Sequence, residues 1–101
     1  MKDNFLIQVN AGLAREMFDL RDTQPEAVAL MELILSELDE DNHASLSQSN
    51  LAEMLALPPD TVLTLARGLM AWGWLDSVVF DCDVLFALVN KEYARVLPES
   101  D

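Results

Sequence analysis

The sequence predicts an α+β fold that is mainly helical and ends in a β-hairpin. Apolar residues recur at helical spacing in four segments between residues 11 and 72. Two β-rich apolar runs follow, with three polar residues between them. The chain has 101 residues, of which 51% are hydrophobic. Because this is enough to bury one core, we expect a single domain over residues 1–101.

A short strand and a short helix are expected first. Residues 5–9 alternate weakly between apolar and polar side chains and predict an edge strand. Asn10 follows at the position of an N-cap, where its side chain can accept hydrogen bonds from a first helical turn. Apolar residues at helical spacing then predict a helix over residues 11–20.

A second helix is expected over residues 24–38. Thr23 and Glu26 have the spacing of a capping box, and Pro25 fits the first turn, where its missing N–H costs little. The polar run of residues 39–42 is expected to follow the helix.

Two further helices, over residues 47–56 and 60–72, predict a helix-turn-helix. Ser47 suits the N-cap of the first, and residues 57–59 (Leu-Pro-Pro) predict a tight connection because a residue before proline leaves the helical region. Gly73 is expected to end the second helix as its C-cap. The expected buried positions are Leu51, Ala52, Met54, Leu55, Val62, Leu65, Ala66 and Leu69.

The rest of the chain predicts a hairpin and a tail. Residues 74–80 and 84–89 are the β-rich runs, and together they predict a hairpin that spans residues 74–90. Asn90 is expected to cap a last turn, so residues 91–101 are expected to form a C-terminal turn and tail.

This order of elements is that of a winged helix-turn-helix with a short N-terminal helix and the hairpin as its wing. The stretch from Asp39 to Leu75 carries motifs of one group of such proteins, and the return strand has a similar ending. The matching residues are Ser47-Gln48, Leu51-Ala52-Glu53, Leu55, Thr61-Val62, Leu69, Gly73-Trp74 and Phe86-Ala87-Leu88-Val89-Asn90. On these motifs the chain resembles plasmid- and phage-encoded winged-helix proteins. The resemblance implies a role in the control of replication or transcription, although one fold serves many functions.

The charge argues against DNA binding by plain electrostatic attraction. The chain has six Lys and Arg and eighteen Asp and Glu, which gives a net charge of −12 and a pI near 4.1. The expected DNA-facing helix has Arg67 as its only outward cation and Asp60 in its first turn, while Asp81 and Asp83 flank the wing tip. Since phosphate neutralisation supplies most non-specific affinity for DNA, these carboxylates oppose binding.

A protein partner is the first functional hypothesis. Leu63, Arg67 and Met70 stand at i, i+4 and i+7, so they share one side of the helix, and Trp72 follows at its end. Exposed Leu, Met, Trp and Arg are typical of a protein–protein contact. The alternative is that these residues pack in the core under the N-terminal segment or the C-terminal tail.

The acidic residues extend this hypothesis to a DNA mimic. A dense negative surface can occupy a basic nucleic-acid groove on a partner, and the protein would then act as an inhibitor or modulator. The candidate phosphate-like residues are Glu37, Asp39, Glu40, Asp41, Asp81 and Asp83. The alternative is a solvated face that keeps the protein soluble.

The second functional hypothesis is a DNA-binding regulator of replication or transcription. In this case Thr61, Thr64 and Arg67 would contact an operator, and the helix over residues 11–20 would form the contact of a homodimer.

No enzyme activity, cofactor or metal is expected. His43 is the sole histidine and has no nucleophile pattern near it, and Cys82 stands between two aspartates that disfavour its thiolate. The residues from Asp39 to His43 could chelate a divalent cation, but they lack the spacing and the glycine of a calcium loop. A solvated acidic loop is therefore expected.

A cytoplasmic location is expected. One cysteine forms no internal disulfide, and no apolar run reaches the roughly 20 residues of a membrane span. The apolar stretch after Met1–Asn4 ends by Val9, which is too short for a signal peptide.

Overall fold

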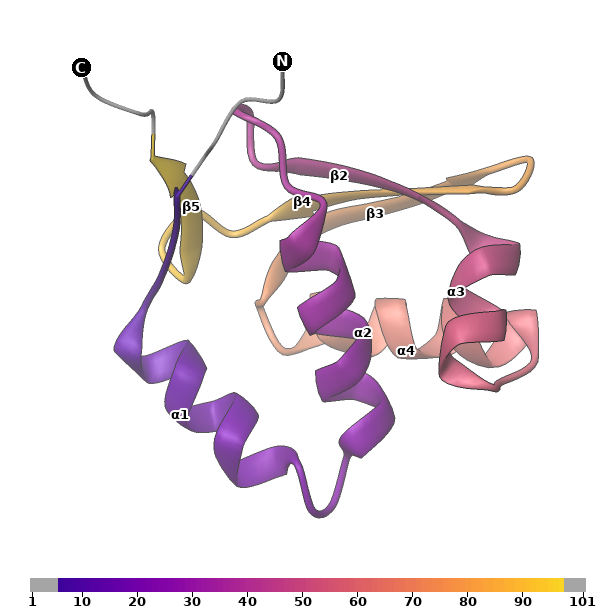
Figure 1. The fold of residues 1–101 in the computed structure, drawn as a ribbon, viewed down its shortest axis with the longest axis horizontal. Coiled ribbons are helices and arrows are strands. Elements are labelled where there is room, and N and C mark those ends of the chain that lie inside the picture. Colours follow the sequence, from indigo (N-terminus) through magenta and orange to yellow (C-terminus); the bar gives the residue numbers. More distant parts are fainter. Residues whose placement is uncertain (1–5, 98–101) are drawn as a thin grey trace.

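The computed structural model describes residues 6–97 and has four helices and two small antiparallel sheets, so the predicted α+β class is confirmed (Figure 1). None of the helices in this range is long and apolar enough to cross a membrane. In chain order the elements are β1 (Leu6–Val9), α1 (Ala11–Leu20), α2 (Pro25–Ser36), β2 (His43–Ser47), α3 (Gln48–Leu55), α4 (Pro59–Ala71), β3 (Leu75–Asp81), β4 (Val84–Val89) and β5 (Ala94–Leu97).

The larger sheet has the strand order β2-β4-β3, with both pairs antiparallel. The hairpin expected over residues 74–90 is confirmed as β3 and β4, joined by a turn at Cys82 and Asp83. Strand β2 was not predicted, because only five residues alternate there and their apolar signal is weak. These residues form a strand because they pair with β4, and the periodicity of a sequence does not show which segments pair.

The smaller sheet joins the two ends of the described chain. Strand β1 pairs with β5 along its length, from Leu6 opposite Leu97 to Val9 opposite Ala94. The expected edge strand is thus confirmed within residues 6–9, and Phe5 lies outside the described residues. The expected turn and tail over residues 91–101 is wrong in its middle, since residues 94–97 form β5. Residues 98–101 lie outside the described range.

The start of α1 agrees with the prediction, whereas that of α2 does not. The Asn10 side chain accepts hydrogen bonds from the N–H groups of Gly12 and Leu13. The predicted capping box at Thr23 is wrong: Gln24 is the N-cap and makes no side-chain cap bond. Pro25 at the first helical position has no N–H, so the start of α2 has one fewer backbone donor that needs a partner.

Helix α2 also ends at Ser36, two residues before the predicted end. The N–H groups of Glu37 and Leu38 bond to carbonyls three residues back, so the last turn tightens. Leu38 is buried and belongs to the core although it is outside the helix.

Helices α3 and α4 lie close to the bounds predicted for the helix-turn-helix. Ser47 is the N-cap of α3, and its hydroxyl accepts from the N–H of Asn50 at 3.2 Å. At the end of α4, Trp72 is the C-cap and Gly73 follows with φ +85°. The N–H groups of Gly73 and Trp74 bond back to the carbonyls of Met70 and Leu69, which is a Schellman ending.

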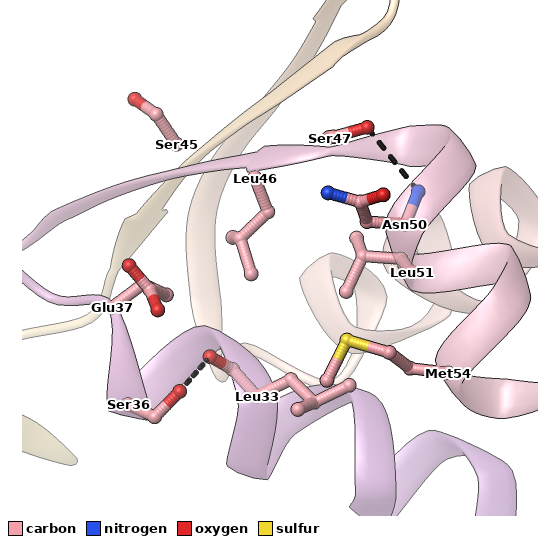
Figure 2. A pocket seen from close by; sticks show the side chains of 9 residues that line it. All are labelled: Leu33, Ser36, Glu37, Ser45, Leu46, Ser47, Asn50, Leu51 and Met54. Atoms are coloured by element: carbon pink, nitrogen blue, oxygen red, sulfur yellow. Dashed lines mark hydrogen bonds between the residues drawn. The ribbon is translucent and has the colours of Figure 1, made fainter.

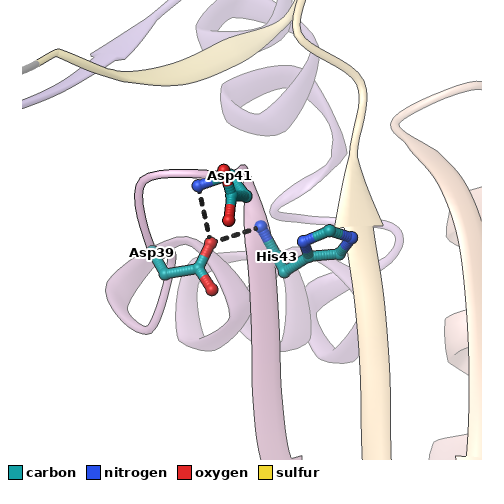
Figure 3. A group of neighbouring side chains, drawn as sticks. All are labelled: Asp39, Asp41 and His43. Carbon is teal, nitrogen blue, oxygen red and sulfur yellow. Dashed lines mark hydrogen bonds between the residues drawn. The ribbon is translucent and has the colours of Figure 1, made fainter.

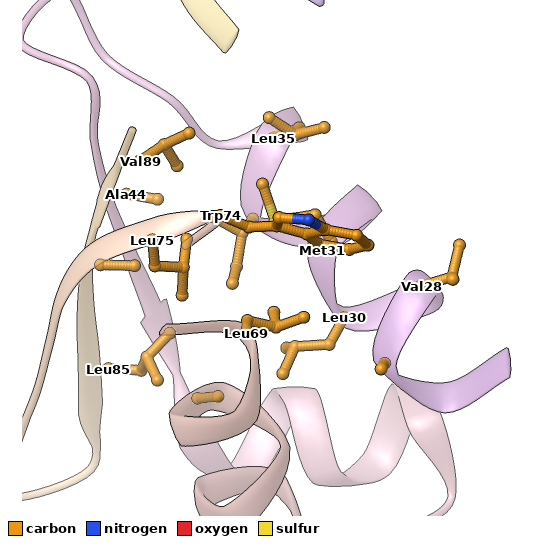
Figure 4. Packing of buried hydrophobic residues seen from close by; sticks show 14 of the residues in the cluster. Val28, Leu30, Met31, Leu35, Ala44, Leu69, Trp74, Leu75, Leu85 and Val89 are labelled. Atoms are coloured by element: carbon orange, nitrogen blue, oxygen red, sulfur yellow. The ribbon is translucent and has the colours of Figure 1, made fainter. Parts of the chain in front are cut away.

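The core lies between the helices and the inner face of the larger sheet (Figure 4). Its largest fully buried side chains include Trp74, Leu13, Leu30, Met31, Ile34, Leu51, Leu69, Leu75 and Leu85. Two expected core positions, Leu55 and Leu65, are only half-buried. The prediction that Met54 is buried is wrong, since this residue is 64% exposed. Met54 lies at the edge of the face that α3 turns inward, beside the exposed Glu53.

Asn42 is the single buried polar residue among residues 6–97 for which burial is described. Its side-chain amide donates to the carbonyls of Val89 at 2.9 Å and Ala94 at 2.8 Å. Its own carbonyl accepts from the N–H of Val89, and its φ is +66°. Asn42 therefore joins the end of β4 to the start of β5, a role that a polar loop residue does not reveal in sequence.

We expect Asn42→Gly to lower the free energy of unfolding by about 1–3 kcal/mol, because two buried carbonyls lose their donor. Glycine tolerates the positive φ, so this variant isolates the hydrogen bonds from backbone strain. Asn42→Ala loses the same bonds and adds strain, so it should be less stable still. Urea denaturation of the three proteins measures both differences. Wild-type stability in Asn42→Gly would refute the role of the amide.

Ala56, which follows α3, has φ +57° and bears the left-handed conformation that usually belongs to glycine. We expect Ala56→Gly to stabilise the protein by roughly 0.5–1 kcal/mol, since it relieves this strain. The control is Ala52→Gly, inside α3, where glycine should destabilise by a similar amount or more. Thermal unfolding followed by circular dichroism measures both. A lower melting temperature for Ala56→Gly would contradict this account.

Candidate functional site

Three of the predicted partner-contact residues lie on one flank of α4. Arg67 is exposed, Met70 is 40% exposed and Leu63 is half-buried. The core side of the same helix presents Val62, Ala66 and Leu69 to the interior. The i, i+4, i+7 spacing thus places Leu63, Arg67 and Met70 together at one margin of the core-facing side.

Trp72, the fourth predicted partner residue, lies elsewhere. It follows Leu63 by nine residues, which at 3.6 residues per turn places it about half a turn away around the helix. Its ring packs edge-on against the buried ring of Trp74, with centroids 5.1 Å apart and planes at 66°. The structure therefore divides the predicted contact into an α4 surface (Leu63, Arg67, Met70) and a separate site at Trp72.

That separate site is an open cavity of about 450 Å³ between α1 and the end of α4. We call it the Trp72 pocket; its lining residues are Glu16, Asp19, Leu20, Gln24, Trp72 and Trp74. Trp72 is 40% exposed, whereas Trp74 is buried and donates from Nε1 to Glu16 Oε1 at 2.8 Å. Glu16 and Asp19 were not predicted as site residues. Their i, i+3 spacing indicates that they share one face of a helix. The sequence does not indicate that this face lies next to Trp72.

The residues predicted to contact DNA offer few groups that could bind a phosphate backbone. Thr61 is half-buried, and the Thr64 hydroxyl donates to the carbonyl of Asp60 at 3.1 Å within the helix. Arg67 is the only cation on α4, and Asp60 lies in its first turn. Electrostatic attraction for a phosphate backbone is therefore small along this helix.

The other cations in residues 6–97 lie on or near α1 and β5. Arg15 is on α1, and Arg21 follows that helix and pairs with Glu32 at 2.8 Å. Lys91 lies in the turn that precedes β5 and Arg95 lies within β5, which is on the opposite side of the molecule from the β3–β4 turn (Figure 1). Apart from Arg67, the cations of residues 6–97 thus lie outside α4 and the β3–β4 hairpin.

The predicted acidic surface divides into two clusters. Residues 37–41 lie in and around the loop that enters β2 at His43, and Asp81 and Asp83 lie at the turn near the other end of that strand. The five residues of β2 span about 14 Å at roughly 3.4 Å per residue. All six predicted carboxylates are exposed, but they do not form one continuous patch.

Asp83 has a structural role at the start of α3. Its carboxylate accepts from the Ser47 hydroxyl at 2.7 Å, the Ser49 hydroxyl at 2.8 Å and the Ser49 N–H at 3.1 Å. Its carbonyl accepts from the N–H of Gln48 at 2.7 Å. These bonds satisfy free donors of the first turn of α3 and attach the hairpin turn to that helix. Asp83 is thus engaged within the protein.

The same hydrogen bonds stabilise the ionised carboxylate. The Ser47 hydroxyl and then the Ser49 hydroxyl lower the pKa of Asp83 from its ordinary value; desolvation opposes them and the Ser49 N–H adds to them.

Asp39, Asp41 and His43 are brought together by the loop before β2 (Figure 3). Each offers a ligand atom, and these atoms lie within 4.8 Å of one another. Asp39 Oδ1 accepts from the N–H groups of Asp41 and His43, both at 2.9 Å. These two hydrogen bonds within the loop hold the Asp39 carboxylate in place. All three side chains are exposed.

A second hollow, of about 270 Å³, lies between α2, β2 and α3 (Figure 2). Leu33, Leu46, Leu51 and Met54 supply its apolar surface, and its polar lining is Ser36, Glu37, Ser45, Ser47 and Asn50. It has one carboxylate and no aromatic ring, so it offers little chemistry beyond contact with a small apolar group.

Asp83→Asn should change the pH dependence of stability. Because the pKa of Asp83 is lowered in the folded protein, its stabilising effect is present above the unfolded pKa and is lost as the pH falls through the folded pKa. Asp83→Asn should therefore be less stable than the wild type near neutral pH, and this difference should shrink below about pH 4.

The control is Asp81→Asn, because the Asp81 side chain makes no hydrogen bond with residues 6–97 and the net charge changes equally. Urea denaturation at a series of pH values measures both variants. A constant difference between Asp83→Asn and the wild type at all pH values would contradict the assignment.

Comparison with known proteins adds no relative. No protein-family model, no curated protein and no solved structure matches this chain.

Proposed function

We propose that this chain is a winged-helix protein that binds a positively charged protein surface rather than DNA. The winged-helix assignment is supported by the order of α3, a tight connection, α4 and the β3–β4 hairpin. It is further supported by β2, which precedes α3 and pairs with β4, so that the hairpin belongs to a three-stranded sheet.

One observation carries the choice of partner. The surface that a winged helix would turn toward DNA has Arg67 as its cation, against Asp60, Asp81 and Asp83. Half or more of the hydrogen bonds in protein–DNA complexes go to phosphate and sugar, and cations supply the affinity. The same carboxylates favour a basic protein surface, and Met70 adds exposed apolar area beside Arg67.

The proposal is contact with a basic protein surface and does not extend to imitation of a DNA backbone. The carboxylates that would imitate phosphates lie in two clusters at opposite ends of β2. Asp83 in addition holds the start of α3 through the serine hydroxyls. Charge attraction with exposed apolar residues is enough for a partner contact.

The first test is binding to random duplex DNA at about 50 mM salt, the condition that favours phosphate contacts. By fluorescence anisotropy we expect no binding by the wild type. Asp60→Lys combined with Asp81→Lys should gain salt-sensitive affinity, because both positions lie on the expected DNA face and neither is needed to cap α3. Binding by the wild type would overturn the proposal.

The matched control is Asp22→Lys combined with Glu26→Lys, which changes the net charge equally at exposed positions near the start of α2. Equal DNA affinity in both double variants would mean that total charge decides, and the winged-helix orientation would lose its support. The positive arm is a titration with oligo-arginine, for which we expect binding that weakens as salt increases. Absence of binding there counts against a basic partner.

A further inference from the structure

We propose that the Trp72 pocket receives an arginine side chain of the protein partner. This inference rests on the proposed function and adds a specific anchor to it. The pocket joins an open aromatic surface to two carboxylates in one hollow, and these are the groups that recognise a guanidinium.

The aromatic surface is Trp72. Trp72 is 40% exposed, and its ring packs against that of Trp74 at a centroid distance of 5.1 Å. Trp74 is 1% exposed and part of the core, so it gives Trp72 a rigid support. Tryptophan is the best aromatic partner for a cation placed over its face, and rigidity lowers the entropy lost on binding.

The two carboxylates come from α1. Glu16 Oε1 accepts from Trp74 Nε1 at 2.8 Å, which orients the group toward the aromatic pair. Glu16 Oε2 has no hydrogen bond with any described residue, and neither Glu16 nor Asp19 forms an ion pair within residues 6–97. Their charge is thus available to a cation from another molecule.

No lysine or arginine of residues 6–97 lines this site. Arg21, one residue after α1, is paired with Glu32 at 2.8 Å. Leu20 gives the pocket an apolar side for the methylene stem of an incoming side chain, and Gln24 adds an amide. The hollow is open, so it suits the tip of a side chain from a docked protein better than an enclosed small ligand.

Arginine fits these groups better than lysine. A guanidinium is planar, so it can stack on the Trp72 indole while its N–H groups reach a carboxylate in parallel. An ammonium is a compact point charge that keeps its water more strongly. We therefore expect a preference for arginine, and no binding by the neutral isostere citrulline.

The test uses the full-length protein and the peptide acetyl-Gly-Arg-Gly-amide, with its lysine and citrulline counterparts. ¹H–¹⁵N NMR spectra resolve the two indole N–H groups, and Trp72→Phe identifies that of Trp72. We expect the arginine peptide to shift the Trp72 indole and the amides of Glu16 and Asp19. The lysine peptide should shift them less, and the citrulline peptide should leave them unchanged.

Two variants test the carboxylates, and one controls for charge. Asp19→Asn removes one charge, and Glu16→Gln removes the other while its amide oxygen can still accept from Trp74. Each should weaken binding of the arginine peptide roughly three- to tenfold. Asp22→Asn, an exposed carboxylate outside the pocket, should bind as the wild type does. The dispersion of the amide resonances shows that each variant is folded.

The outcomes separate this inference from the proposed function. If oligo-arginine binds but shifts neither the Trp72 indole resonance nor the amide resonances of α1, the pocket assignment is wrong and the proposal of a basic partner stands. The same conclusion follows if oligo-arginine binds all variants with equal affinity. If citrulline shifts the pocket as arginine does, the pocket does not recognise charge and the inference fails. If neither oligo-arginine nor the arginine peptide binds the folded protein, both proposals fail.

Discussion

The side-chain amide of Asn42 is the interaction on which the joining of the two sheets depends. It donates to carbonyls at the end of β4 and the start of β5 from a fully buried position. Strand β5 in turn pairs with β1, and β1 leads directly into α1. Through these strands the amide contributes to the position of α1, and with it to one wall of the Trp72 pocket. Without it, the carbonyls of Val89 and Ala94 would lose this buried donor, and an unsatisfied buried acceptor costs about 1–3 kcal/mol.

A second constraint acts at the opposite end of the larger sheet. Asp83 attaches the β3–β4 turn to the first turn of α3, so the end of this hairpin is fixed to that helix. An extended hairpin that reaches outward could contact the groove of a duplex, whereas this one is short and its turn is held by serines 47 and 49. Asp83, which the sequence placed among the candidate surface charges, is therefore a structural group.

Electrostatics and packing together decide what the surface of this fold can bind. The net charge of −12 opposes phosphate, and within residues 6–97 the cations lie mainly near α1 and β5. Exposed carboxylates alone would attract any cation weakly, because water and salt screen them. An aromatic ring with a rigid support changes this at the Trp72 pocket, where stacking adds to charge and selects a planar cation.

Local chemistry in the sequence predicted most of the secondary structure. Asn10 and Ser47 cap helices, Gly73 ends α4, and four helical segments and one hairpin were correctly placed, because caps, turns and the 3.6-residue period act within a few residues. Of the site, the shared side of Leu63, Arg67 and Met70 was predictable for the same reason. Strands β2 and β5, the buried Asn42 and the meeting of Glu16 with Trp74 depend on partners 47 to 58 residues away or on strand pairing. Only the tertiary structure decides such contacts, since no local pattern records which distant segment supplies the partner.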